Sequence, residues 1–246
     1  MSLLYVSKII IWFMIYSIIG WIYETILCSV SAKKFVNRGF LNGPYCPIYG
    51  FGALFDILIL GKIENVILLF VFGVIITCTL EYLTSYLMEK LFHARWWDYS
   101  ERKFNINGRV CLLGAVVFGL FSVILIKIIH PSIVYCTNLL SDNAIYIIAI
   151  IFAIGFLSDT IITVSGFSGF NKKLDGLAKS LEEKKIELSS KLRNSSAHFN
   201  LKTVYDNSAH KLNLQQRRML SAFPKFRSTT NNGLLTEIRK IIRKKK

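Results

Sequence analysis

Long apolar blocks separated by short polar stretches occupy the first two thirds of the chain. Four of these blocks have about 20 residues, enough for a helix that rises about 1.5 Å per residue to cross a bilayer core of about 30 Å. They are Ile9–Cys28, Val66–Tyr86, Val110–Ile129 and Ala144–Val164. We therefore expect helical membrane spans rather than a single buried core.

A fifth block, about Ile48–Gly61, is shorter, rich in glycine and interrupted by Asp56. Residues 40–47 precede it, and a re-entrant passage there would supply the missing length if protein or water covers its backbone. The sequence therefore predicts an all-α, polytopic membrane bundle with about five transmembrane helices. Because only Lys8 precedes the first block and Glu24 lies inside it, the pattern favours an uncleaved span over a signal peptide.

The expected orientation follows from Lys and Arg, which concentrate in the cytoplasmic loops of membrane proteins. Residues 29–47 contain three of them and residues 87–109 contain five, whereas the opposite ends of the spans contain only Lys8, Lys62 and Lys127. With five spans, both basic loops and the C-terminus lie on one side. This side is predicted to be cytoplasmic, with the N-terminus outside.

We expect two parts, a transmembrane bundle at 1–166 and a basic cytoplasmic tail at 167–246. Beyond residue 164 the chain holds 19 Lys and Arg but only six Asp and Glu. Anionic lipid headgroups attract such segments with about 1 kcal/mol per basic residue near the surface. Nucleic acid is less favoured, because the tail is tethered to a membrane and no RNA-binding motif is present.

The spacing of leucines within the tail predicts an amphipathic or coiled-coil helix over about Lys172–Arg193. A short basic amphipathic segment follows at Leu234–Lys246. Asn194–Asn232, between them, has no clear periodicity and is expected to be irregular. The tail is therefore predicted to be partly helical and partly irregular.

Cysteine and motif patterns exclude several kinds of chemistry. The five cysteines form no C-x-x-C pair and mostly adjoin apolar blocks, which predicts buried, reduced thiols rather than disulfides or a zinc site; they are Cys28, Cys46, Cys78, Cys111 and Cys136. No P-loop, G-x-S-x-G or kinase signature occurs in the chain. We assign no catalytic residue, metal or cofactor.

The candidate site consists of polar residues at the expected inner membrane boundary. They are Glu24, Arg38, Glu81, Glu89, Trp96, Trp97, Asp98, Asn105, Asn107 and Arg109. Glu24 shares a helical face with the small residues Ser17 and Gly20, so it is expected to face the bundle interior and pair with Arg38 or Arg109. The alternative is a carboxylate that reaches out to the interface.

Glu81, Ser85 and Glu89 lie one turn apart on the third span. With the arginines they could bind a phosphate or carboxylate headgroup, relay protons, or only lock the bundle. Glu89 and His93 have a spacing compatible with metal, but no third ligand accompanies them.

The remaining polar residues have a structural and a functional interpretation. The two tryptophans alternatively form an aromatic belt at the headgroups. Asn105 and Asn107 make a polar turn before the fourth span. Asp56 and Asp159 are lone acids within the spans and each is a functional hypothesis, although Asp159 alternatively pairs with a neighbouring helix.

Three segments carry a resemblance to a known family. They read YSIIGWIYE from Tyr16, NRGFLNGPYCPIYGFG from Asn37, and LEYLTSYLMEKLFHARWWDYSERKFNINGR from Leu80. Over about Ile9–Ser165 the chain resembles a bacterial family of multi-pass membrane proteins labelled ABC-transporter permease, CmpB type. The resemblance implies a location in the bacterial cell membrane and a partnership with a separate ATPase subunit.

Three functions fit these observations. The first is a permease-like transport subunit, oligomeric because five spans are few for a complete pore, that binds a small or lipid-headgroup substrate at an inner-face pocket. The second is an integral-membrane enzyme acting on a lipid or isoprenoid headgroup, for which paired acids would serve as acid and base. The third is a membrane anchor or sensor whose tail binds lipid or protein.

Overall fold

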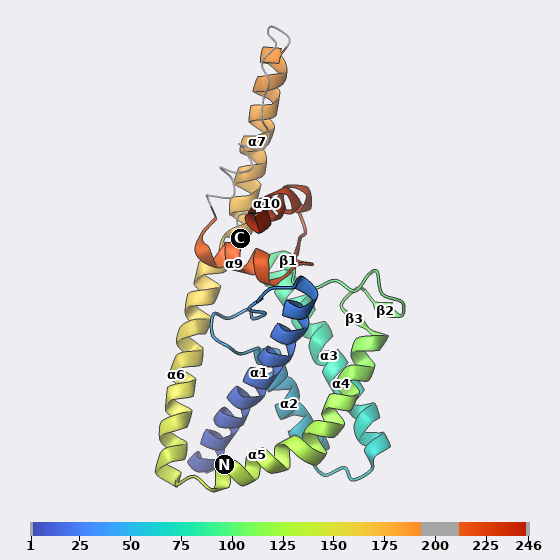
Figure 1. Ribbon diagram of the computed structural model, residues 1–246, viewed down its shortest axis with the longest axis vertical. Helices are drawn as coiled ribbons and strands as arrows, with labels where there is room; N and C mark the ends of the chain where they lie inside the picture. Colours follow the sequence, from blue (N-terminus) through green and yellow to red (C-terminus); the bar gives the residue numbers. More distant parts are fainter. Residues whose placement is uncertain (1, 193–211, 245–246) are drawn as a thin grey trace. The chain divides into compact units, whose positions relative to one another are not determined.

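The computed structural model of the chain describes residues 2–192 and 212–244 and is dominated by helices (Figure 1). Its elements in order are α1 (Leu3–Ala32), α2 (Pro47–Leu60), α3 (Val66–Phe92), β1 (Ala94–Arg95), β2 (Asn105–Ile106), β3 (Val110–Cys111), α4 (Leu112–Ile124), the π-helix η1 (Leu125–Ile129), α5 (His130–Asn138), α6 (Asp142–Phe167), α7 (Phe170–Leu192), α9 (Leu214–Ala222), β4 (Arg227–Ser228) and α10 (Asn232–Lys244).

Four helical stretches among the described residues are long and apolar enough to cross a membrane. They begin at Leu3, Val66, Leu112 and Asp142. The predicted all-α membrane bundle is therefore confirmed as a fold class. α2 is apolar but has only 14 residues, so the expected fifth span remains a prediction, as do the orientation and the re-entrant passage.

The chain forms two compact units. The first contains residues 1–86 and 98–163, and the second contains residues 87–97 and 164–246. The first unit holds α1, α2, α4, η1, α5, most of α3 and most of α6. The second unit holds the end of α3, the strands β1 and β4, and the C-terminal helices.

Within the first unit, α1 and α2 pack closely because glycines lie in the contact. A Cβ atom at Gly20 would lie 2.2 Å from Cγ of Tyr49, and one at Gly50 would lie 2.3 Å from Oγ of Ser17. Neither site therefore has room for a larger side chain. Small residues let helix backbones approach in this way, as expected for the Ser17 and Gly20 face of α1.

This contact gives a first prediction. Gly20→Ala is expected to lower the free energy of unfolding by about 1–3 kcal/mol, because the added methyl group overpacks against the ring of Tyr49. Gly155→Ala in α6 is the matched control, since nothing lies within 4 Å of a Cβ atom there. Thermal unfolding of both variants in lipid nanodiscs measures the difference. Equal unfolding midpoints would show that α1 and α2 do not pack as described.

Helices α4, η1 and α5 form one continuous helical rod, so residues 130–138, which lie between the expected spans Val110–Ile129 and Ala144–Val164, are also helical. Two hydrogen bonds hold α5 against α1: Trp12 Nε1 donates to Thr137 Oγ1 (3.1 Å), and Tyr16 Oη bonds His130 Nδ1 (2.7 Å). The rod bends between α4 and α5 (Figure 1), where the π-helical turn and Pro131 interrupt regular α-helical bonding.

Asp159 of α6 anchors the non-helical segment that precedes α2. Its carboxylate accepts hydrogen bonds from the backbone N–H groups of Asn42 (3.1 Å) and Gly43 (2.7 Å) and from Tyr45 Oη (2.7 Å). The Asn42 amide and Thr163 hydroxyl also donate to it. Burial, together with this carboxylate, raises the pKa of Tyr45. The hydrogen-bond partners of Asp159 outside α6 therefore lie in a loop, not in a neighbouring helix.

The second unit has its own core, built by the C-terminal chain around the end of α3. β1 pairs antiparallel with β4, placing Ala94 opposite Ser228. Five aromatic rings pack together there: Phe92, Trp96, Phe167, Phe170 and Phe226. Leu235 and Ile238 of α10 are fully buried as well. These two apolar side chains of α10 are therefore used inside this unit.

Much of the tail follows the sequence-based expectations, and one segment does not. Helix α7 occurs where leucine spacing predicted a helix, and α10 lies in the segment predicted to be basic and amphipathic. Of the segment expected to be irregular, Asn194–Asn232, residues 194–211 lie outside the described residues. Leu214–Ala222, however, forms α9, so that expectation is wrong there. Its start is fixed by a capping box in which Asn213 and Gln216 exchange side-chain and backbone hydrogen bonds.

Candidate functional site

The loop between α1 and α2 places Arg38 beside α1. Trp21 Nε1 donates to Asn37 Oδ1 (2.7 Å), and the backbone N–H of Arg38 lies 3.4 Å from Thr25 Oγ1. At the end of the loop, the Cys46 N–H donates to the Ser17 carbonyl oxygen (2.8 Å). Because the loop is tied to α1 at both ends, the position of Arg38 is set by helix contacts.

Glu24 of α1 joins this loop to α2. Arg38 Nε lies 3.6 Å from Glu24 Oε2, and Tyr49 Oη of α2 donates to Glu24 Oε1 (2.8 Å). Both charged side chains are mostly buried, with 15% of Arg38 and 29% of Glu24 exposed. Of the two arginines that the sequence put forward as partners, Arg38 makes this ion pair.

Glu81 of α3 lies near this pair and is buried, with 6% of its surface exposed. Tyr99 Oη donates to its Oε1 (3.2 Å). Its Oε2 has no hydrogen-bond partner among the described residues. A buried carboxyl oxygen without a partner is costly. Glu81 is therefore the group of the site that can accept a further hydrogen bond.

Glu24, Arg38, Tyr49, Glu81 and Tyr99 form one electrostatic group, which we call the acid–tyrosine cluster. The charge of Glu24 acts on both Glu81 and Tyr99. Burial, followed by the charge of Glu81, raises the pKa of Tyr99, so its hydroxyl remains a donor. The cluster draws its members from α1, α2, α3 and two loops of the first unit.

The nearby Cys46 thiol is not a nucleophile at neutral pH. Burial, and then the charge of Glu24, raises its pKa to about 12, whereas an activated cysteine has a lowered pKa. No group of three or more His, Cys, Asp or Glu within the described part of the chain is arranged to hold a metal ion. Glu89 and His93, whose spacing is compatible with metal binding, are therefore not part of such a group.

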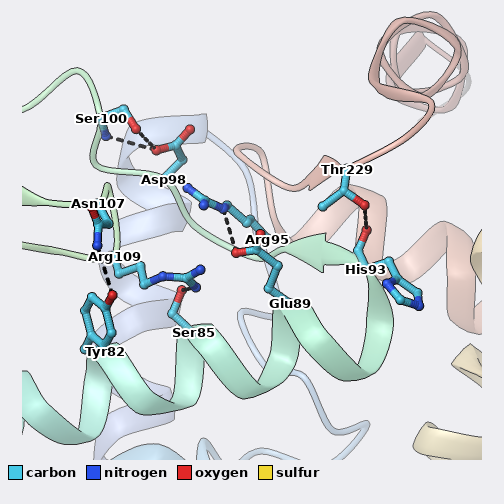
Figure 2. Close-up of polar contacts among 10 residues, drawn as sticks. All are labelled: Tyr82, Ser85, Glu89, His93, Arg95, Asp98, Ser100, Asn107, Arg109 and Thr229. Carbon is cyan, nitrogen blue, oxygen red and sulfur yellow. Dashed lines mark hydrogen bonds and ion pairs between the residues drawn. The ribbon is translucent and has the colours of Figure 1, made fainter.

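Arg109 and Asn107 fasten the turn before α4 to α3 (Figure 2). Arg109 Nη1 donates to Ser85 Oγ (3.2 Å), and its guanidinium lies 5.5 and 5.4 Å from the ring centres of Tyr82 and Tyr86. Asn107 Nδ2 donates to Tyr82 Oη (2.9 Å). Such cation–π contacts stabilise a buried guanidinium. Arg109 therefore contacts α3 one turn after Glu81, at Ser85, and Asn107 contacts it at Tyr82, the residue that follows Glu81.

Asp98 and Asn105 shape the same turn. Asp98 Oδ1 accepts hydrogen bonds from the backbone N–H (2.9 Å) and hydroxyl (2.5 Å) of Ser100 (Figure 2), and Asn105 Oδ1 accepts from the Gly108 N–H (2.9 Å). Gly108 has φ +67°, and a Cβ atom there would lie 2.6 Å from Asp98 Oδ1. The contacts of Asp98 and Asn105 thus organise the loop that carries Tyr99 and Arg109.

The other three predicted residues belong to the second unit. Glu89 pairs with Arg95, with Oε2 and Nε 2.8 Å apart. Trp96 is only 2% exposed and packs in the aromatic core, so its interpretation as part of a lipid-facing belt is wrong. Trp97 is half-buried. The folded C-terminal chain supplies Phe226 to this core, a contact that no local pattern predicts.

Sequence reasoning missed the two tyrosines of the cluster. Tyr99 lies in the polar segment before the fourth span, and Tyr49 lies in the short apolar block that forms α2. The available signal for both is the tyrosine hydroxyl, which needs a hydrogen-bond partner when buried. That signal does not identify the partner, which in both cases is a carboxylate on another element.

Comparison with known proteins agrees with the resemblance of the three segments. The sequence profile of a family described as "Putative ABC-transporter type IV" matches residues 11–164, which is more than half of the chain. No curated protein and no solved structure matches. The matched region contains every member of the acid–tyrosine cluster. The chain therefore belongs to this ABC-transporter type IV family and is a transport-related membrane protein.

Proposed function

We propose that this chain is the membrane-embedded, permease-like subunit of a transport system and that its acid–tyrosine cluster binds the substrate. The observation that supports this most strongly is Glu81, a buried carboxyl group that keeps one oxygen without a partner in the described residues. Ionisable residues retained within apolar helices are costly and commonly mark substrate pathways. A substrate would provide the missing partner.

The cluster fits a small or lipid-headgroup substrate with two kinds of polar group. The open oxygen of Glu81 suits a hydrogen-bond donor, such as a hydroxyl or ammonium group. Arg38 suits a phosphate or carboxylate, which guanidinium groups bind with directed hydrogen bonds. Tyr49 donates a hydrogen bond to Glu24, and Tyr99 donates one to Glu81. These two bonds hold the carboxylates in place.

The proposed transport system includes a separate cytoplasmic ATPase, because this chain has no P-loop of its own. The subunit would act as an oligomer in the bacterial cell membrane, with its C-terminus in the cytoplasm. Exposed basic residues of the second unit would attract anionic headgroups there; they include Lys172, Lys173, Lys179, Lys225 and Arg227. Charge rather than insertion would drive this attraction, because the apolar side chains of Leu235 and Ile238 in α10 are buried.

The experiment that tests the proposed function is co-purification from a bacterial membrane in nanodiscs, with chemical cross-linking before solubilisation. We expect a P-loop ATPase to be cross-linked to this chain and the purified complex to hydrolyse ATP. An uncomplexed chain without an ATPase would refute the proposed system. A change in lipid mass without ATP would instead support an enzyme acting on headgroups.

A further inference from the structure

A second buried carboxyl group lies outside the acid–tyrosine cluster, at Asp56 in the middle of α2. It is 2% exposed. Ala53, one turn before it, packs in an apolar cluster with Trp12 of α1 and Leu125 of η1. Leu60, one turn after it, packs with Leu69, Ile126 and neighbouring side chains. Asp56 therefore lies between two apolar clusters on the same face of α2.

The only polar side chain bonded to Asp56 within the described residues is Ser122 of α4. One carboxyl oxygen, Oδ1, has no hydrogen-bond partner in that part of the chain. Ser122 is itself buried and sits against Gly73 of α3, where a Cβ atom would lie 2.5 Å from the Ser122 Cβ. This close packing of α3 and α4 fixes the hydroxyl that faces Asp56.

The surroundings of Asp56 favour the neutral acid over the carboxylate. The Ser122 hydroxyl has one proton to donate, and it is shared between Asp56 and the Phe118 carbonyl oxygen, which lies 3.0 Å from Ser122 Oγ. An ionised carboxylate would therefore hold its charge among apolar side chains with Oδ1 unpartnered. A neutral carboxylic acid avoids the cost of an unpaired charge in an apolar environment.

We propose that Asp56 is a proton-binding site of the membrane bundle, neutral in this conformation and ionised only when water reaches its carboxyl group. The π-helical turn η1 follows Ser122 by three residues and packs against α2, and Ala53 and Leu125 belong to the same apolar cluster. π-helical turns within α-helices are often found at functional sites. A shift at η1 would open the carboxyl group to water and release its proton.

Within the described residues, no basic side chain acts on Asp56 to hold it as an anion. Among the titratable groups on the elements around α2, Tyr16 of α1 and His130 of α5 bond each other. Lys127 of η1 is exposed, and its Nζ lies 3.4 Å from the Ile63 carbonyl oxygen. Cys78, further along α3, is a neutral thiol. The proton is therefore the ligand that this site fits, and this inference does not depend on the proposed function.

Infrared spectroscopy tests the proposal. Wild-type protein in nanodiscs of phosphatidylcholine and phosphatidylglycerol is compared at pH 7 with Asp56→Asn and with the control Asp142→Asn, whose aspartate is exposed at the start of α6. An ordinary aspartate is ionised at this pH. We expect a carbonyl stretching band of a neutral carboxyl group that is lost in Asp56→Asn, kept in Asp142→Asn, and lost reversibly from wild type at alkaline pH.

Labelling wild-type protein with side-chain ¹³C-aspartate provides a second measurement that does not require the variant to fold. The band should move to lower frequency, which glutamate labelling would not cause. Ser122→Ala should move the unlabelled band to higher frequency, because the carboxyl group loses its hydrogen bond to Ser122. A band that is absent at pH 7, or that does not respond to aspartate labelling, would overturn the proposal.

Discussion

Replacing Asp159 with alanine is expected to lower the free energy of unfolding by about 2–4 kcal/mol. The change leaves two backbone N–H groups, those of Asn42 and Gly43, without their acceptor and removes the acceptor of Tyr45. Hydrogen bonds to a charged group contribute about 1.5–3 kcal/mol each, but their contributions are not additive when they share one acceptor. The loop that carries Arg38 would then lose its tie to α6.

Thermal unfolding in nanodiscs measures the stability of this variant, and maleimide labelling of Cys46 reports the loop. The experiment uses a background in which the other four cysteines are serine. Because its burial raises its pKa to about 12, Cys46 should react slowly in the parent protein and faster in Asp159→Ala. Asp142→Ala, an exposed position on the same helix, is the control. The account of the loop would be wrong if both alanine variants matched the parent.

Reversing the charge of Arg38 is expected to have the next largest effect. Arg38→Glu would place a second carboxylate beside Glu24. The site is partly open to solvent, because 15% of the Arg38 side chain and 29% of the Glu24 side chain are exposed. We expect a loss of about 2–3 kcal/mol, below the cost for a fully buried pair because solvent screens part of the repulsion. Glu24→Arg should be destabilising for the same reason, with Tyr49 losing its acceptor in addition.

The double variant Glu24→Arg, Arg38→Glu distinguishes the ion pair from unrelated packing effects. Restoring opposite charges should recover part of the loss, with a coupling energy of about 1 kcal/mol or more in the double-mutant cycle. Thermal unfolding midpoints of the four proteins supply the cycle. Strict additivity of the two single losses would mean that these side chains do not interact.

The parts of the fold that depend on local sequence could be predicted, because the length of an apolar run is enough to specify a spanning helix. This holds for α1, α3 and α6. The helical stretch around His130 and Pro131 could not be predicted, since a proline usually marks the end of a helix. Proline is tolerated in the first turn of a helix, and His130 gains its partner from Tyr16, far away along the chain.

Tertiary contacts also explain what sequence reasoning missed in the site. Arg38 could be proposed as a partner of Glu24 because both were expected at the same membrane boundary. Trp96 could not be placed correctly, because its burial depends on Phe226 and on the pairing of β1 with β4. Tyr99 meets Glu81 only because the turn after α3, closed by Gly108, directs it back to that helix.

The central claim is that the buried acid at Glu81 takes part in transport. The most direct test compares the rates of ATP hydrolysis by the cross-linked complex carrying either Glu81→Gln or the control Glu64→Gln. Glu64 is an exposed glutamate in the loop before α3. We expect the first variant to assemble normally but to lose about tenfold or more in rate, equivalent to at least about 1.4 kcal/mol, while the second keeps the wild-type rate. A correctly assembled Glu81→Gln complex with the wild-type rate would contradict the claim.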